Sequence, residues 1–479
     1  MRRLEIFVLV AIIILAFGLR LYKINRPIAD WHSWRQADTA AVARNFTKDG
    51  FNLLVPKYDD MSSQANGLDN PQRYRFVEFP IYNSLVAIVW KIIGSTQAVY
   101  ARLTTVVITL FSTLFLYLLV KKFSNWQTAS LAAFFFAIIP YNVFYSSTVL
   151  PAPFMVFSLL GLYYFFAKWM ENDKKKLFGI LSVVFANLAI LSWPIALLFM
   201  LPPFYLAYEK YQLSLFKKPH LWVFAILSLT PFILWRIWML KFPQGIPNFQ
   251  FLLNENNIRF KGAFFRWLIA ERMGKLILTT CGFALLILGL VQKEGREKWF
   301  YFSYLASTLL YLSVFASGNV RHDYYQIPAV PILCVFMAIG AKMLLFPTKD
   351  FVNKYISRTI LAGLVFLTVA LGYYEVQGFY WINKPEIVEA GKAADRLLPK
   401  EATVVAPYLG DTALLYQTGR RGYPITDRDL RDYIKAGTKF LVSVDVNDAG
   451  IQNLAQDCKT IEKTDKYVIV EMFEDCIGK

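Results

Sequence analysis

The length, composition and charge of the chain exclude most classes of soluble protein. Of its 479 residues, 56% are hydrophobic and 17% are aromatic, whereas soluble domains are usually about 45 to 50% apolar. The formal net charge is +17, but the basic residues are spread between apolar runs and form no basic-aromatic module that could read bases, so nucleic acid is not an expected partner. The composition predicts a mainly α-helical, polytopic protein embedded in a lipid bilayer.

The apolar runs predict about eleven transmembrane helices of the usual length, about 17 to 25 residues. The first follows the basic residues MRR, and because no small-residue cleavage site comes after it, we expect a retained helix rather than a signal peptide. The other ten runs cover approximately residues 98–120, 127–144, 148–169, 177–193, 194–209, 220–240, 275–292, 299–317, 325–346 and 358–380.

The distribution of lysine and arginine predicts the orientation, because short basic loops stay cytoplasmic. With a cytoplasmic amino terminus, the basic segments at 121–122, 168–176, 217–218, 293–298 and 349–358 all fall on the inner side. We therefore expect a transmembrane region over residues 1–380, whose first outer loop (24–97) carries juxtamembrane helices. Residues 381–479 are then a soluble extracytoplasmic domain.

The first outer loop concentrates polar and aromatic residues that lipid would not tolerate. The stretch ADWHSWRQADTAAVARNF (29–46) has helix-forming alanines from Gln36 onward, which predict a helix. The later stretch VEFPIYNSLVAIVWKIIG contains a short apolar run (77–93) that is typical of an interfacial helix. The alternative for the first stretch is an amphipathic helix whose charges only face water and lipid headgroups.

The carboxy-terminal region alternates strands with amphipathic helices, which predicts a small α/β domain. We expect strands at 402–407, 439–444 and 467–473, helices at 386–398, 411–417 and 427–436, and a turn at GRRG (419–422). Cys281 and Cys334 lie in apolar runs and are expected to pack as small hydrophobes. Cys458 and Cys476 can pair only in an oxidising compartment, and the sequence leaves that pairing open.

The outer side holds acidic residues that suit acid–base or metal chemistry. A positioned carboxylate base contributes about 10² to 10⁴-fold to a rate, and Asp38 and Asp30 are the candidates for this role. Glu78 and His322 are candidate ligands of a divalent metal ion, the only cofactor considered. The alternative for His322 is a hydrogen-bonded interfacial residue. With three histidines in the chain, a multi-histidine metal site is excluded.

Basic and aromatic residues on the same side suit an anionic, sugar-bearing lipid. Guanidinium groups make bidentate contacts with phosphate. The candidate phosphate-binding residues are Arg35, Arg44, Arg102, Arg259, Lys261, Arg266, Arg272 and Arg321, and those that could contact the sugar or the polyprenyl chain are His32, Trp34, Tyr324 and Tyr325. The alternatives are a solvated cationic loop and the aromatic belt of a membrane protein.

Six pieces of the chain resemble the GT-C superfamily of membrane glycosyltransferases, in particular bacterial members similar to protein O-mannosyltransferases and the lipid A aminoarabinose transferase. The pieces are WHSWRQADTAAVARNF, VEFPIYNSLVAIVWKIIG, ARL (101–103), PYNVFYSSTVLPAP (140–153), RHDYYQIPAVP (321–331) and LLYQTGRRGYPI (414–425). The resemblance implies a GT-C fold and a plasma-membrane enzyme of bacteria. It also implies transfer of a sugar, with inversion, from a polyprenyl-phosphate donor to a hydroxyl of an envelope acceptor on the extracytoplasmic face.

The resemblance also implies roles for individual residues. Asp38 takes the place of the family's base, with Asp30 second, and Glu78 takes that of a second acidic site that can bind a divalent cation. The chain departs from its relatives at Arg35 and Gln36, where they have adjacent Asp and Glu, and at Ala152, where many have an acid.

Two other functions use similar features. A transporter or flippase of lipid-linked sugars would share an aromatic, cationic outer cavity, but it should carry ionisable or discontinuous segments near the bilayer midplane. The predicted spans are nearly free of charge, which favours an enzyme. A polysaccharide polymerase or ligase, with a lipid-linked oligosaccharide as donor, is a further alternative.

Overall fold

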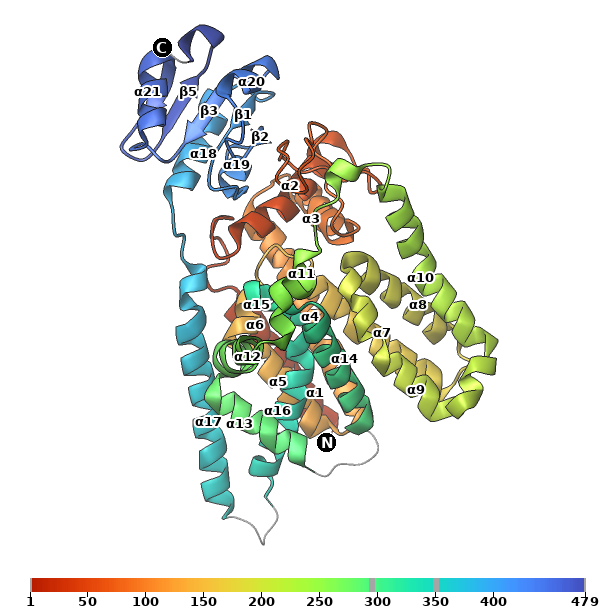
Figure 1. Cartoon of the computed structure of the whole chain (residues 1–479). Coiled ribbons are helices and arrows are strands. Elements are labelled where there is room, and N and C mark those ends of the chain that lie inside the picture. Colours follow the sequence, from red (N-terminus) through yellow and green to blue (C-terminus); the bar gives the residue numbers. More distant parts are fainter. Residues whose placement is uncertain (1, 293–297, 348–352, 478–479) are drawn as a thin grey trace. The chain divides into compact units, whose positions relative to one another are not determined.

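The computed structural model describes residues 2–292, 298–347 and 353–477, and it is mainly helical with one small sheet (Figure 1). The predicted fold class is confirmed in this respect. The chain forms two compact units: the first comprises Met1–Ile24, Arg102–Arg236 and Phe249–Gly378, and the second comprises Asn25–Ala101, Ile237–Asn248 and Phe379–Lys479. Of the predicted cytoplasmic segments, residues 293–297 and 349–352 lie outside the described residues.

The first unit is built from apolar helices. Within it, α7 packs against α8, α13 packs against α16, and α5 contacts both α1 and α16. Its elements are α1 Arg2–Arg20, α4 Ala98–Phe123, α5 Trp126–Ile138, α6 Pro140–Tyr145, α7 Ala152–Glu171, α8 Lys176–Ser192, η1 Pro194–Phe199, α9 Leu201–Tyr211, η2 Gln212–Lys217, α10 Pro219–Met239, α11 Phe251–Asn254, η4 Glu255–Phe260, α12 Gly262–Phe265, η5 Arg266–Ile277, α13 Thr279–Val291, α14 Lys298–Val314, α15 Ala316–Arg321, η6 Asp323–Ala329, α16 Val330–Leu345 and α17 Lys354–Val376; the first four residues of α4 and the last three of α10 belong to the second unit.

Judged by length and composition, the described residues contain fewer membrane-spanning helices than the sequence predicts. Among the described residues, five helices are long and apolar enough to cross a membrane, or six if the pair η5 and α13, bent by 108°, is one span. The predicted count of eleven is not confirmed. Several predicted runs are interrupted: residues 127–144 divide into α5 and α6, and residues 194–209 divide into η1 and α9.

At the break between α5 and α6, side chains of the first unit provide hydrogen bonds to the backbone carbonyls that the interrupted helix leaves without a partner. Pro140 has no amide hydrogen to donate to the Phe136 carbonyl. Instead, the Asn142 side chain donates to that carbonyl at 2.6 Å and Arg20 Nη2 donates to it at 3.3 Å. Arg20 Nη1 also donates to the Ala137 carbonyl at 3.0 Å, so a fully buried arginine on α1 holds the break.

The second unit combines the predicted first outer loop with the carboxy-terminal domain. Its central helix α2 (Ser33–Asp49) begins after His32, whose φ of 54° is left-handed, and ends before Gly50, whose φ is 88°. Its remaining helices are α3 Ile81–Ile93, η3 Pro243–Gly245, η7 Gln377–Tyr380 at the unit boundary, α18 Glu386–Leu397, α19 Ala413–Gln417, α20 Leu430–Lys435, α21 Ala449–Asp457 and η8 Glu474–Cys476.

A five-stranded sheet of order β2-β1-β3-β5-β4 organises the carboxy-terminal domain. Its strands are β1 Thr403–Val405, β2 Arg421–Tyr423, β3 Phe440–Ser443, β4 Lys459–Lys463 and β5 Val468–Glu471. Strand β1 is parallel to β2 and β3, whereas β5 is antiparallel to β3 and β4. The three predicted strands correspond to β1, β3 and β5, and the sequence missed β4, a short charged edge strand.

The predicted turn at GRRG is partly wrong. Gly419 turns the chain with a φ of 66°, but the residues after it form β2. A Cβ on Gly422 would lie 1.8 Å from the Val404 carbonyl oxygen. A glycine at this position therefore permits the close approach of β2 to β1 rather than a turn.

Helices cover both faces of this sheet. One face packs against α18 and α19, with Ile387 and Leu414 in its core. The other packs against α20 and α21, with Tyr433 and Leu454 in its core. Cys458 and Cys476 form a disulfide beside the second core, which resolves the pairing that the sequence left open.

Candidate active site

Helix α2 buries its polar residues in the second unit. All twelve residues from Arg35 to Phe46 are buried, and they include two arginines and one aspartate. Burial of a neutral polar group without a hydrogen bond costs ~2 to 7 kcal/mol, and burial of an unpaired charge costs more. Buried charges therefore need partners. The alternative in which these charges merely face water and headgroups is therefore wrong for this helix.

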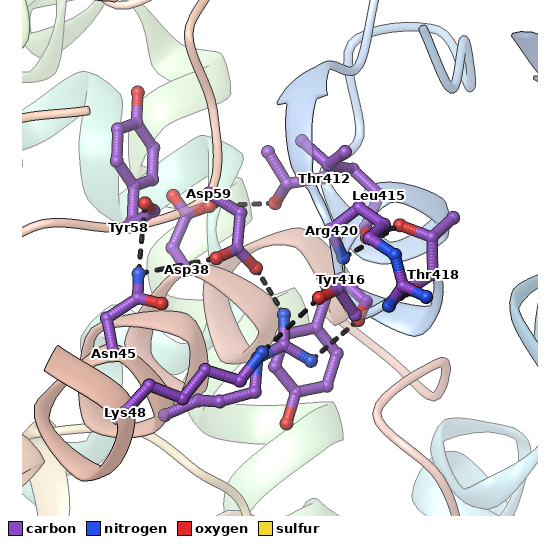
Figure 2. Close-up of polar contacts among 12 residues, drawn as sticks. Asp38, Asn45, Lys48, Tyr58, Asp59, Thr412, Leu415, Tyr416, Thr418 and Arg420 are labelled. Carbon is purple, nitrogen blue, oxygen red and sulfur yellow. Dashed lines mark hydrogen bonds and ion pairs between the residues drawn. The ribbon is translucent and has the colours of Figure 1, made fainter. Parts of the chain in front are cut away.

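Asp38 is held by two residues that are distant in the sequence. Its Oδ2 forms an ion pair with Arg75 Nη2 at 2.6 Å. Its Oδ1 accepts a hydrogen bond from Thr412 Oγ1 at 2.7 Å (Figure 2). The side chain is 5% exposed. Each carboxylate oxygen has a second lone pair, so the two contacts fix the orientation of Asp38 and leave it able to accept a proton.

Sequence reasoning missed both partners of Asp38. Arg75 stands in a turn-rich stretch and Thr412 in a loop 374 residues from Asp38. The guanidinium of Arg75 lies over the ring of Tyr58, 5.0 Å from its centroid. Arg75 Nε is buried and lacks a hydrogen-bond partner within the described ranges. The one usable signal was the position of Arg75 three residues before Glu78.

Asp30, the second candidate base, is committed to neighbours in its own segment. Its Oδ2 accepts from Arg26 Nε at 2.5 Å, and its Oδ1 accepts from Gln36 Nε2 at 2.9 Å. The side chain is fully buried. These contacts fix the chain at the start of α2.

The two arginines of α2 are also paired with acids. Arg35 Nη2 lies 2.7 Å from Glu78 Oε2. Arg44 forms an ion pair with Asp59, and its Nη1 donates to the Tyr416 carbonyl at 2.9 Å. Figure 2 shows that the Asp59 carboxylate also accepts a hydrogen bond from the Asn45 side chain. Arg44 thereby connects α2 with α19, and both arginines have their charge compensated by protein.

Glu78 does not fit a divalent metal as placed. The Arg35 guanidinium stands at its carboxylate, where a cation would have to sit. Among the residues that the structure describes, no group of three or more His, Cys, Asp and Glu side chains could hold a metal ion. His322, the other predicted ligand, belongs to the first unit.

The charge of Asp38 affects the pKa of two further carboxyl groups. Burial raises the pKa of Asp60, and the charge of Asp38 raises it further, although hydrogen bonds from Ser62 and Gln64 oppose the shift. Burial likewise raises the pKa of Asp411, and Asp38 adds to this effect while Ser33 and Ala413 oppose it. Acidic groups from the first loop and from the carboxy-terminal domain thus share one electrostatic environment.

The predicted sugar-contacting residues of this unit lie at the start of α2. His32 contacts the edge of Trp31, which stacks on Phe379 with ring centroids 4.9 Å apart. Trp34 is half-buried, and its carbonyl accepts from Thr412 Oγ1 at 3.2 Å. Trp34 is therefore adjacent to the group that holds Asp38.

The remaining predicted basic residues belong to the first unit. Arg102 is fully buried and donates to the Ser147 carbonyl at 2.9 Å. Lys261 is exposed, and Arg266, 78% exposed, lies 3.9 Å from Glu271. These three residues do not gather in one place: Arg102 is on α4, whereas Lys261 and Arg266 flank α12.

Three predicted basic residues do gather around α15. Arg259 donates to the Val314 carbonyl at 3.1 Å, and Arg272 donates to the Val320 carbonyl at 2.9 Å. Arg321 forms an ion pair with Glu255. The Nε atoms of Arg259 and Arg272 are buried without a hydrogen-bond partner in the part of the chain that the structure describes.

The predicted aromatic residues of the first unit form one cluster. Tyr324 and Tyr325 are buried and contact each other with ring centroids 4.9 Å apart. Both also contact His322 and Trp193.

Comparisons with known proteins agree with the fold. Residues 77–238 match the family model described as dolichyl-phosphate-mannose-protein mannosyltransferase. The chain is similar over 99% of both chains to ArnT from Cupriavidus metallidurans bound to undecaprenyl phosphate, with a TM-score of 0.67 and 13% identity. A comparison with curated proteins finds no match.

A second relative of known structure is the oligosaccharyltransferase AglB of Archaeoglobus fulgidus, solved with an inhibitory peptide and a dolichol-phosphate. The similarity covers 93% of this chain and 70% of that one, with a TM-score of 0.58 and 12% identity. The Archaeoglobus enzyme was also solved in complex with Zn and sulfate. The resemblance to the GT-C superfamily of membrane glycosyltransferases that the sequence predicts is thus confirmed at the level of the fold.

Proposed function

We propose that the protein is an inverting glycosyltransferase of the bacterial plasma membrane. It transfers a sugar from a polyprenyl-phosphate donor to a hydroxyl of an envelope acceptor on the extracytoplasmic face. About eleven spans over residues 1–380 carry the first outer loop (24–97), and residues 381–479 form the outer domain. The observation that carries the proposal is the buried Asp38, fixed by Arg75 and Thr412 in a fold shared along its whole length with a polyprenyl-phosphate-binding protein.

The outer location of the site has independent support in the disulfide between Cys458 and Cys476. Structural disulfides persist in oxidising compartments and are rare in the cytosol. The disulfide lies in the same unit as Asp38. The disulfide therefore supports the proposal that Asp38 and the acceptor are on the same side of the membrane.

In the proposed reaction, Asp38 accepts the proton of the acceptor hydroxyl. The hydroxyl oxygen forms a bond to the anomeric carbon as the bond from that carbon to the phosphate oxygen breaks. The electron pair of the broken bond leaves with the polyprenyl phosphate. Arg75 orients Asp38, and direct displacement inverts the configuration at the anomeric carbon.

The leaving phosphate gains negative charge, which nearby cations stabilise. Arg35, Arg44 and Arg75 are each paired with an acid in the second unit, and Arg75 holds the proposed base, so none of the three stands out as the ligand of the leaving phosphate. The predicted residues Arg102, Arg259, Lys261, Arg266, Arg272 and Arg321 of the first unit are further candidates. A phosphate is a good leaving group, so no step is assigned to a metal ion.

The test is transfer by the purified full-length protein in detergent, offered a panel of polyprenyl-phosphate sugars and an envelope extract. We expect one donor to be consumed and a new glycosylated product to appear. In the Asp38→Asn variant the rate should fall by about 10² to 10⁴-fold, the usual contribution of a positioned base.

Asp30→Asn is the matched control, because it also neutralises a buried carboxylate of the same segment. It should retain transfer in whatever fraction of the protein remains folded. Full activity in Asp38→Asn with loss in Asp30→Asn would move the base to Asp30. Consumption of none of the donors would contradict the proposed function, and movement of the carrier across vesicles without a product would favour a flippase.

A further inference from the structure

The parallel strands of the carboxy-terminal sheet create a topological switch point. Strand β2 lies on one side of β1 and strand β3 lies on the other, and all three are parallel. The connection that leaves β1 runs through α19 to β2, the one that leaves β3 runs through α21, and these two helices cover opposite faces of the sheet. In open α/β sheets, ligands bind in the crevice outside the carboxyl ends of the strands at such a point.

A crevice occupies this position in the protein. Its volume is about 920 Å³, which lies in the range of small-molecule sites, about 300 to 1,000 Å³. Residues that follow each of the three parallel strands line it: Leu409 after β1, Thr426 after β2, and Asp445 and Asn447 after β3. The crevice therefore coincides with the switch point and is separate from the Asp38 network.

Leu409 is unusual at the mouth of this crevice. The side chain is 99% exposed, and the backbone φ of 53° is left-handed. A bulky residue rarely adopts this conformation, and it persists where the surroundings fix it, commonly at a ligand site. An exposed leucine contributes nothing to the core of the domain, so its apolar surface is available to a ligand, together with that of Ile451 on the other wall.

The polar groups of the crevice disfavour an ionic ligand. Asp445 pairs with Lys384 at 3.1 Å, so these two charges largely cancel. The amino terminus of α21 is capped by its own Asp448, whose Oδ1 accepts from the Ile451 amide at 3.0 Å. A carboxylate at that terminus repels phosphate, whereas a neutral ligand that both donates and accepts hydrogen bonds suits the mixture of Asn, Thr, Asp and Lys.

We infer that this crevice binds a neutral saccharide. A peptide would be expected instead at the edge of a sheet, where backbone groups pair with it. The β2 edge already pairs with the first loop, since the Met61 amide donates to the Gly422 carbonyl at 2.8 Å and the Gly422 amide donates to the Asp59 carbonyl at 3.0 Å. The crevice presents side chains at strand ends, which is the arrangement for a small polyhydroxylated ligand.

The loop after β1 connects the crevice with Asp38. Leu409 lines the crevice, and Thr412, three residues later, donates to Asp38. Three residues span at most about 11 Å. The identity of the saccharide, unlike its binding, rests on the proposed function. On that function the saccharide is part of the acceptor, and a glycan held in the crevice can present a further hydroxyl to Asp38.

The test is saccharide binding by the full-length protein in detergent, measured by isothermal titration without any donor lipid. The probes are neutral trisaccharides of glucose, galactose, mannose or rhamnose, with an uncharged pentapeptide as the comparison. We expect saturable binding of at least one trisaccharide. Leu409→Gly and Asp445→Ala should each weaken that binding by at least tenfold.

The variants separate recognition from folding. Leu409→Gly removes the side chain and also relieves the left-handed backbone, so its unfolding temperature should stay the same or rise. Glu471→Ala is the control for Asp445→Ala, because it breaks the comparable Lys459 pair at 2.8 Å on β4 and β5; it should bind like the unaltered protein.

Binding must also survive in Asp38→Asn, which tests transfer and leaves the crevice intact. The failure of the proposed reaction is thereby distinguishable from the failure of this site. Absence of saccharide binding, preference for the peptide, or binding that both crevice variants leave unchanged would overturn the inference.

Discussion

Thr412→Val tests whether the carboxy-terminal domain orients the proposed base. The substitution keeps the shape of the side chain and removes the hydroxyl that donates to Asp38 Oδ1 at 2.7 Å. A hydrogen bond to a charged group contributes about 1.5 to 3 kcal/mol. Each 1.36 kcal/mol corresponds to a factor of ten in rate, so a base that depends on this contact should lose about 10- to 150-fold in kcat/KM.

The assay measures transfer from the donor identified by the panel of polyprenyl-phosphate sugars, alongside the unfolding temperature in the same detergent. Thr412→Ser keeps the hydroxyl and should restore most of the rate. Thr418→Val is the matched control: Thr418 is also buried in the same region (0% exposed, against 7% for Thr412), but its hydroxyl donates to the Leu415 carbonyl at 2.7 Å, away from Asp38.

The result that would refute the reasoning is specific. If Thr412→Val transfers sugar at the rate of the unaltered protein, the contact does not orient Asp38 for catalysis. If Thr418→Val loses the same factor, the loss reflects general packing of this region. Only a loss confined to Thr412→Val supports a domain contact that serves the reaction.

Three further predictions concern buried charges and the disulfide. Burial raises the pKa of Asp60 above 3.8, so ionisation of this carboxyl group destabilises the folded protein as the pH rises through the raised pKa. Asp60→Asn should therefore raise the unfolding temperature at pH 7. This gain should vanish below about pH 4, as measured by thermal unfolding across pH. Arg35→Leu leaves the buried Glu78 unpaired and should cost about 3 to 5 kcal/mol, whereas Arg35→Leu with Glu78→Leu should recover much of the unfolding temperature. Cys458→Ser opens a loop with a sequence separation of 18 and should cost about 3 kcal/mol, and in the unaltered protein Cys458 and Cys476 should be alkylated only after reduction, a pattern readable by mass spectrometry.

Local patterns of the sequence predicted the elements whose signal is local. The alanines after Gln36 predicted α2, and the alternating apolar residues predicted β1, β3 and β5. The segment of α19 was predicted to be helical, and LLYQTGRRGYPI (414–425) was recognised as part of the resemblance, although Thr412 was not chosen. These successes share one cause, because backbone periodicity and helix propensity are properties of neighbouring residues.

Contacts between distant segments could not be predicted in the same way. Arg75 and Thr412 meet Asp38 because the first loop folds with the carboxy-terminal domain, and a single sequence carries no record of that pairing. The same pairing explains why Arg35 and Arg44, expected to bind phosphate, have acidic partners instead. The interruption at Pro140 likewise divides a run that composition alone reads as one span.

The contact between Asp38 and Thr412 also has a consequence for biogenesis. The two residues are separated by 374 positions, and ribosomes add about 5 to 20 residues per second, so roughly 20 to 75 seconds pass between their synthesis. During that interval the segment that completes the surroundings of helix α2 is not yet made, so the charges of α2 lack their partners from the carboxy-terminal domain. On the proposed topology, a truncation that stops translation before Thr412 should leave the first loop sensitive to proteases of the cell envelope.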